Sequence, residues 1–219
     1  CKFTIVILFM VIGMGKLSYT SIDNRAFGIG IDDRVLPMKA ILQSQGIHHI
    51  TLNGADRKTS IDFWQDVLGM KLIFEQPNLD DETENHLYFD CGDGRTVTVF
   101  TNEKRKGAIE PLKNQVGSVH HLAFWVSQST LRIADKKLKN RGIGSSGIKD
   151  RGFMDSIYFR DPLGLLIELA SYKFEPPLGC TYGQVLEKAH ELRLARGVKN
   201  IEDEDISNSL VILSEKGIR

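Results

Sequence analysis

One carboxylate stands alone in an apolar stretch of the sequence. Glu168 lies within residues 164–170, where every other residue is apolar or glycine. An ionised carboxylate in such a segment is costly unless a partner pairs with it or a ligand binds it. Before it, a strand that carries Tyr158 runs into Asp161-Pro-Leu-Gly164, whose residue types are those of a tight turn. The sequence therefore predicts a hairpin whose second strand presents Glu168 to a partner.

Two histidine pairs, His48-His49 and His120-His121, are the candidate partners of this carboxylate. Each pair lies in a segment with strand-like alternation, so His49 and His121 each belong to one face of a strand. Two imidazoles and a carboxylate in a facial triad leave open positions on an octahedral divalent metal, as in non-haem Fe(II) oxygenases. A hydrogen-bonded core residue is the usual alternative for a single strand histidine. Together, His49, His121 and Glu168 predict a site for Fe(II), with Mn(II) as the second candidate.

The elements that position these residues occur twice. Residues 46–104 show a strand, a helix and three further strands, and residues 117–174 repeat this order. The histidine pairs are 72 residues apart, and the glycines of the two final hairpins are 70 apart. With the offset of 70 residues, Thr98 in the first module corresponds to Glu168 in the second.

An α+β fold is expected, with the two βαβββ modules curled into one half-open mixed β-barrel around the metal site. The expected domain spans residues 46–176. Residues 1–45 are interpreted as an irregular N-terminal arm. Residues 177–219 are expected to form a C-terminal helical hairpin that begins at a capping box, Thr181-x-x-Gln184, and serves packing or dimer formation.

The amino-acid composition limits which binding partners and which cellular compartment are expected. Lys+Arg and Asp+Glu number 28 each, and this balance argues against nucleic acid and anionic membranes as partners. The three cysteines share no short spacing, which favours a reducing compartment, and the cytoplasm is expected. Residues 3–14 form an apolar run too short for a transmembrane helix. This run is either a targeting segment or a non-native extension before Met14, and the sequence leaves both open.

One glycine-rich motif matches a dinucleotide-binding pattern but lies in the wrong structural context. Gly142-Ile-Gly-Ser-Ser-Gly147 fits the pattern G-x-G-x-x-G, yet it follows a predicted helix and precedes a predicted strand. Dinucleotide binding requires the reverse order, with the glycines between a strand and a helix. We interpret this motif as a loop that ends a helix.

Three motifs of the duplicated region resemble those of a known superfamily. They are Gly46-Ile-His-His-Ile-Thr-Leu52, Val119-His-His-Leu-Ala-Phe124 and Ile157-Tyr-x-x-Asp-Pro-x-Gly-x-x-x-Glu168. Residues 46 to about 174 thereby resemble the vicinal oxygen chelate superfamily of glyoxalases, bleomycin resistance proteins and extradiol dioxygenases. The upstream histidine of the extradiol signature is replaced here by Lys-Asp-Arg at 149–151. The chain is therefore similar to the hydroquinone-type ring-cleaving dioxygenases, although these typically have four modules and this chain has two.

The resemblance implies roles for further residues. It places Fe(II) on the predicted triad and implies a surrounding shell of His48, Thr51, His120, Arg151 and Tyr158. Arg151 would hold a phenolate or enolate oxygen, and Tyr158 would hydrogen-bond the same oxygen or move a proton. Plain strand alternation disagrees for His48 and His120, because it places them on the opposite face, under the helices.

The expected function is that of a metal-dependent extradiol-type dioxygenase that cleaves a catechol or hydroquinone ring with O₂. One alternative is a glyoxalase-like lyase or isomerase with another divalent metal, a class that tends to use a fourth protein ligand where this chain has Thr98. Another is a non-catalytic small-molecule-binding module. The expected partners are a small aromatic substrate, O₂ and a second copy in a homodimer. The exact substrate, the native metal and the pairing of modules within one chain or between two stay open.

Overall fold

The structure is a computed structural model that describes residues 42, 44–107 and 111–216. Residues 46–219 form one compact unit. The apolar run near the start of the chain lies outside the described residues. In the described part of the chain, no helix is long and apolar enough to cross a membrane.

The first module has the predicted order βαβββ. Asp56 caps its helix by accepting a hydrogen bond from the Thr59 amide at 2.8 Å. The first strand runs parallel to the last strand of the module, and the other pairs are antiparallel, in the order β1-β4-β3-β2. The elements are β1 (His49–Asn53), α1 (Arg57–Trp64), β2 (Leu72–Pro77), β3 (Asn85–Asp90) and β4 (Thr96–Thr101).

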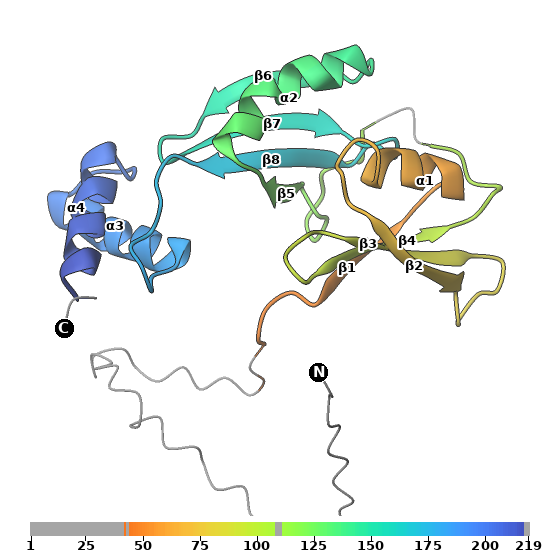
Figure 1. Cartoon of the computed structure of the whole chain (residues 1–219), viewed down its shortest axis with the longest axis horizontal. Helices are drawn as coiled ribbons and strands as arrows, with labels where there is room; N and C mark the ends of the chain where they lie inside the picture. The colour runs from red at the N-terminus through yellow and green to blue at the C-terminus, as the bar shows by residue number, and fades with distance from the viewer. Residues whose placement is uncertain (1–41, 43, 108–110, 217–219) are drawn as a thin grey trace, which may run out of the picture. The chain divides into compact units, whose positions relative to one another are not determined.

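The second module repeats this plan, which confirms the predicted duplication. Its sheet has the order β5-β8-β7-β6, again with one parallel pair, and Figure 1 shows α2 lying across it. The fold class is α+β, and the described strands form two four-stranded sheets that are not closed into a barrel. The elements are β5 (Leu122–Trp125), α2 (Gln128–Asn140), β6 (Ser145–Asp150), β7 (Met154–Arg160) and β8 (Leu166–Tyr172).

The two modules share one hydrophobic core. The rings of Trp64 in α1 and Phe124 in β5 lie 6.1 Å apart between centroids, and those of Phe63 and Phe159 lie 6.3 Å apart. Each sheet turns one apolar face to this core, and alternation then places its polar side chains on the opposite face. The strand residues of the core are Leu87, Phe89, Val97, Val99, Ile157, Phe159, Ile167 and Leu169.

The predicted helical hairpin follows the second module as α3 (Tyr182–Arg196) and α4 (Asp203–Lys216). Thr181 and Gln184 form the predicted capping box, and Gly197 ends α3 with a φ of 75°. The hairpin has a second hydrophobic cluster of its own, to which Phe174 contributes. The hairpin is thus packed onto the end of β8 by apolar contacts.

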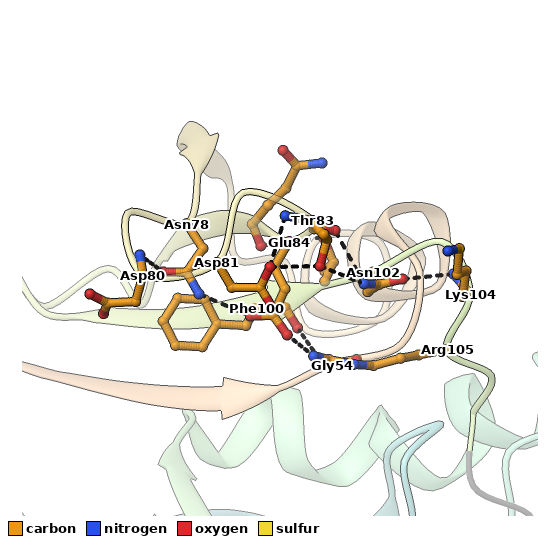
Figure 2. A network of polar contacts seen from close by, with 12 residues as sticks. Gly54, Asn78, Asp80, Asp81, Thr83, Glu84, Phe100, Asn102, Lys104 and Arg105 are labelled. Atoms are coloured by element: carbon orange, nitrogen blue, oxygen red, sulfur yellow. Dashed lines mark hydrogen bonds and ion pairs between the residues drawn. The ribbon is translucent and has the colours of Figure 1, made fainter.

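Figure 2 shows a network of polar side chains at one end of the first sheet. Glu84 is only 8% exposed, accepts a hydrogen bond from Asn78 Nδ2 at 2.9 Å and forms an ion pair with Arg105. Arg105 Nη1 also donates to the carbonyl oxygens of Gly54 and Phe100, each at 3.3 Å. Because a buried carboxylate needs such partners, the network ties the connection between β2 and β3 to the segment after β4.

Candidate functional site

Glu168 lies in the middle of β8, and its side chain is 4% exposed. The preceding turn is the predicted one, because Asp161 Oδ1 accepts hydrogen bonds from the Leu163 and Leu165 amides at 2.8 Å and Gly164 has a φ of 84°. Tyr158 stands directly opposite Glu168 on β7 and donates its hydroxyl to Glu168 Oε1 at 2.9 Å. The hairpin thus buries a carboxylate and gives it one hydrogen-bond donor.

His121 is the second partner of this carboxylate. Its Nε2 lies 2.9 Å from Glu168 Oε2, and its side chain is 34% exposed. The Nδ1 atoms of His120 and His121 are 2.7 Å apart, and the Arg151 guanidinium carbon lies 5.3 Å from the centre of the Tyr158 ring. The structure thus gathers the predicted residues of the second module in one place. We call them the carboxylate cluster: His120, His121, Arg151, Tyr158 and Glu168.

The predicted residues of the first module lie at the other sheet, where Thr51 contacts Thr98. Thr98 Oγ1 donates to Thr51 Oγ1 at 2.9 Å, across the parallel pair β1 and β4. The Nδ1 atoms of His48 and His49 are 2.8 Å apart. Thr98 stands opposite Tyr88, as Glu168 stands opposite Tyr158, and this confirms the predicted equivalence of Thr98 and Glu168.

His86 is a residue of this site that the sequence analysis missed. Its Nε2 lies 2.8 Å from Thr98 Oγ1, and its Nδ1 lies 3.1 Å from the Tyr88 hydroxyl. Burial lowers the pKa of the His86 imidazole, and the charge of His49 lowers it further. The signal was present in the sequence, because His86 is two residues from the tyrosine that repeats Tyr158. We call this group the threonine cluster: His48, His49, Thr51, His86, Tyr88 and Thr98.

The positions of His48 and His120 correct the expectation from strand alternation. Both side chains are exposed, and neither is buried beneath a helix. The physical reason is that β1 begins at His49 and β5 begins at Leu122. His48 and His120 therefore precede the strands, where alternation does not apply.

A single chain offers only part of the predicted metal site. His121 Nε2 and the Glu168 carboxylate are a nitrogen and an oxygen donor of the types that divalent iron or manganese accepts. Among the described residues, however, no group of three His, Cys, Asp or Glu side chains lies close enough to hold a metal ion. The donors therefore fit the expected metal in kind, but His49 does not complete the set within one chain.

Comparison with known proteins places this geometry in a family. The model of the Glyoxalase/Bleomycin resistance protein/Dioxygenase superfamily matches residues 46–169. "Putative ring-cleaving dioxygenase MhqO" of Bacillus subtilis is 28% identical over 143 residues, which are 65% of this chain and 45% of that protein. "Chlorohydroquinone/hydroquinone 1,2-dioxygenase" of Sphingobium indicum is 28% identical over 129 residues, 57% of this chain and 38% of that protein.

A relative of another activity matches a larger share of its own length. "Metallothiol transferase FosB" of Staphylococcus haemolyticus is 29% identical over 136 residues, which are 61% of this chain and 88% of that protein. The chain thus spans less than half of the dioxygenase relatives and most of the transferase. Since the family model covers more than half of the chain and both modules, the chain belongs to the Glyoxalase/Bleomycin resistance protein/Dioxygenase superfamily.

Proposed function

We propose that the chain is a metal-dependent extradiol-type dioxygenase that opens a dihydroxylated aromatic ring, of catechol or hydroquinone type, with O₂. The observation that carries the proposal is the carboxylate cluster, in which a buried Glu168 has a histidine nitrogen at 2.9 Å and a tyrosine hydroxyl at 2.9 Å. The ring-cleaving relatives support the substrate class, because they carry that activity in their names.

The proposed metal ligands are His49, His121 and Glu168, and Fe(II) is the proposed metal, with Mn(II) as the second candidate. When bound, such a metal supplies Lewis acidity toward phenolic oxygens and a redox route between the ring and O₂. A set of three protein ligands leaves positions for both reactants, which suits a dioxygenase. Thr98 supports this number, because it holds the place where a fourth protein ligand would stand.

Two side chains of the carboxylate cluster are proposed to act on the substrate. The Arg151 guanidinium, held over the Tyr158 ring, is a charge-assisted donor for a phenolate oxygen. The Tyr158 hydroxyl donates its one proton to Glu168 in this structure, and we propose that it turns to the same substrate oxygen or moves a proton to it during the reaction. His48, His120 and Thr51 are proposed to orient the ligands and the bound ring from their neighbouring positions.

The second candidate function is metal-dependent group transfer, lyase or isomerase chemistry. It is favoured by length, since the chain spans 88% of the FosB transferase but 45% of MhqO. The same three ligands would then hold another divalent metal, and Arg151 would hold an anionic group of the substrate.

The decisive experiment measures O₂ uptake after anaerobic loading with Fe(II), using a panel of catechols and hydroquinones. We expect O₂ consumption that is lost in His121→Ala and Glu168→Gln and kept in Asp155→Asn. Asp155 lies on β7 of the same sheet, so this control removes a carboxylate outside the cluster. Metal binding without O₂ uptake for any diphenol, together with metal-dependent thiol transfer or isomerisation, would replace the proposal by the second candidate. Absence of metal binding would favour a non-catalytic binding module.

A further inference from the structure

The face of the second sheet that carries Glu168 continues toward the C-terminal hairpin. On β8, Ala170 and Tyr172 share this face with Glu168, because alternate side chains of a strand point to the same side. The register of the sheet places Trp125 of β5 directly opposite Ala170. Two residues along a strand advance it by roughly 7 Å. Trp125 and Ala170 therefore lie one such step from the carboxylate cluster, and Tyr172 lies two steps from it.

An aromatic group that includes a residue of the hairpin ends this face. Tyr182, the first residue of α3, stacks on Tyr172, with the ring centroids 4.2 Å apart and an interplanar angle of 13°. The ring of Trp125 lies 6.1 Å from that of Tyr182, again between centroids. We call Trp125, Tyr172 and Tyr182 the aromatic wall. The wall joins the edge strand of the sheet to the hairpin.

The ring of Tyr182 is held from two sides. Besides the stack on Tyr172, its hydroxyl donates a hydrogen bond to Glu175 Oε2 at 2.7 Å. Burial and this hydrogen bond raise the pKa of Tyr182 to about 12, so the hydroxyl keeps its proton near neutral pH. The capping box at Thr181 starts α3 at this point and fixes the backbone that carries the ring. Tyr182 is therefore a fixed apolar surface and not a carrier of protons.

The face between the aromatic wall and the carboxylate cluster is open. Trp125 is 69% exposed, Ala123 beside it on β5 is exposed, and Ala170 is half-exposed. Two alanines leave this part of the face without bulky side chains. A large exposed aromatic ring next to a polar cluster is typical of a small-molecule site, in which apolar walls surround a few placed polar groups.

The two ends of the open face differ in chemistry. The cluster end has the Arg151 guanidinium and the Tyr158 hydroxyl, which suit the oxygen atoms of a ligand. The wall end has the faces and edges of aromatic rings, which suit a flat or branched apolar group. The face thus fits a molecule with phenolic oxygens at one end and an apolar group at the other.

We propose that the aromatic wall contacts the ring substituent of the diphenol substrate, and that it selects catechols with an apolar group on the side of the ring remote from the hydroxyls. The inference rests on the proposed function, which places the hydroxyls at the carboxylate cluster. A branched alkyl group para to a hydroxyl bridges the step of roughly 7 Å to Trp125, whereas an unsubstituted ring leaves Trp125 uncovered. The hairpin thereby takes part in substrate selection through Tyr182.

Anaerobic calorimetric titration of the Mn(II)-loaded protein tests this contact without turnover. The probes are catechol and 4-tert-butylcatechol, and the wild-type protein should bind the second more tightly. Trp125→Ala is expected to weaken the binding of 4-tert-butylcatechol by at least about 10-fold. It should change the binding of catechol by less than about 2-fold, because the hydroxyl end of the site is untouched. Since Trp125 is exposed, this variant is expected to fold.

Two further variants serve as controls. Ile133→Ala removes an exposed apolar side chain from α2, which packs on the opposite face of the sheet, and should leave both affinities unchanged. Tyr182→Phe keeps the ring and removes the hydroxyl, so it should retain the preference for 4-tert-butylcatechol. Loss of the preference in Tyr182→Phe would contradict an apolar ring contact.

Tryptophan fluorescence reports the place of binding separately from the affinity. The chain has two tryptophans, and Trp64 is only 2% exposed, so quenching by acrylamide reports mainly on Trp125. Saturating 4-tert-butylcatechol should reduce this quenching, whereas catechol should not. Quenching that is weak without a ligand and increases when the protein is diluted would assign Trp125 to an interface between copies, and would overturn the inference.

The outcomes separate the inference from the proposed function. Loss of the preference in Trp125→Ala, together with protection from acrylamide in the wild type, supports the aromatic wall as the selecting surface. An unchanged preference in Trp125→Ala, or equal binding of the two catechols by a wild type that consumes O₂, overturns the inference and leaves the proposed function standing. A wild-type protein that neither binds a diphenol nor consumes O₂ with one overturns both.

Discussion

The two sheets have one backbone plan but different polar centres. Tyr88 stands opposite Thr98 in the first sheet, as Tyr158 stands opposite Glu168 in the second. The Tyr158 hydroxyl donates to Glu168 at 2.9 Å, whereas the Tyr88 hydroxyl lies 3.1 Å from His86 Nδ1. The comparison teaches that a single position on a repeated strand decides which module has the negative charge, while the pairing register stays the same.

The same sheets also differ at the end where β3 and β7 begin. In the first module this end is closed by the Glu84–Arg105 ion pair and its hydrogen bonds. In the second module it is closed by the helical hairpin, where the rings of Tyr172 and Tyr182 stack with centroids 4.2 Å apart. The equivalent ends of the two sheets are thus covered by an ion pair in the first module and by stacked aromatic rings in the second.

The largest expected effect tests the core that joins the modules. Trp64→Ala is expected to lower the free energy of unfolding by about 3–5 kcal/mol, because the indole is 2% exposed and touches Phe124 of the other module. Urea unfolding followed by circular dichroism measures this change. Leu79→Ala, at a side chain 87% exposed, is the control and is expected to change stability by less than about 0.5 kcal/mol. Equal effects would contradict a core shared by both modules.

The central comparison is tested by changing Glu168 and Thr98 in parallel. Glu168→Gln is expected to weaken metal binding by more than about 100-fold, since even changes behind a ligand cost about 10–100-fold. Thr98→Val removes a neighbour of the proposed ligand shell, and its effect should stay at or below about 10-fold. Competition with a chelator measures both affinities. Similar losses of metal affinity in the two variants would contradict the proposal that Glu168 binds the metal and Thr98 does not.

The Glu84–Arg105 ion pair of the first module should contribute more to the free energy of unfolding than the exposed Lys173–Asp150 pair of the second. Arg105→Met leaves Glu84, whose side chain is 10% exposed, without its cation, and a cost of about 1–3 kcal/mol is expected. Lys173→Met breaks a pair with Asp150, which is 71% exposed, and should cost less than about 1 kcal/mol. Thermal and urea unfolding compare the two. The double variant Arg105→Met/Glu84→Gln should recover part of the stability that Arg105→Met loses. A double variant as unstable as Arg105→Met would contradict an energetic coupling between Glu84 and Arg105.

The half-buried imidazole of His86 in the threonine cluster should make the metal-free protein sensitive to acid. Folding lowers the pKa of His86 below its ordinary value of 6.5, so the unfolded chain binds more protons as the pH falls through that value. Stability supplied by neutral His86 is therefore present above this pH and is lost below it. His86→Phe should flatten this part of the pH profile, measured by unfolding in chelator between about pH 7.5 and 5. An unchanged profile, with His190→Gln as an exposed control, would contradict the assignment.

The smallest effect is expected at the position that repeats His86 in the second module. Ser156 is buried, and its Oγ has no hydrogen-bond partner among the described residues. Ser156→Ala should therefore leave stability unchanged or raise it by up to about 1 kcal/mol. Chemical unfolding measures the change. A loss larger than that would mean that the hydroxyl contributes to the site, as His86 does in the first module.

Most of the features that the sequence predicted correctly depend on residues that are close together in the chain. Alternation and helical spacing located both modules, and the offset of 70 residues placed Thr98 at the register position of Glu168. The turn at Asp161 and the capping box at Thr181 were likewise predictable, because both depend on neighbouring residues. Such features need no knowledge of how distant segments pack.

Longer-range features were not predictable from these patterns. Alternation shows which side chains share a face, but not which face of one sheet meets the other module. The separation of His49 from Glu168 therefore appears only in the structure. The Glu84–Arg105 pair joins loops 21 residues apart, and no periodic pattern marks it. The expectation that His48 and His120 lie buried under the helices is wrong, because strand alternation does not hold for residues that precede the first residue of a strand.

The equivalence of Thr98 and Glu168 also bears on how many ligands the protein can give to the proposed metal. A carboxylate at both register positions would offer the metal two acids beside the histidines and would leave fewer positions for a substrate and O₂. Thr98 instead presents a hydroxyl, which donates to Thr51 Oγ1 at 2.9 Å. The pairing of Tyr88 with Thr98 repeats that of Tyr158 with Glu168, so this difference involves no change in strand pairing. The residue type at one position of the repeated strand thus sets how much room the proposed metal has for reactants.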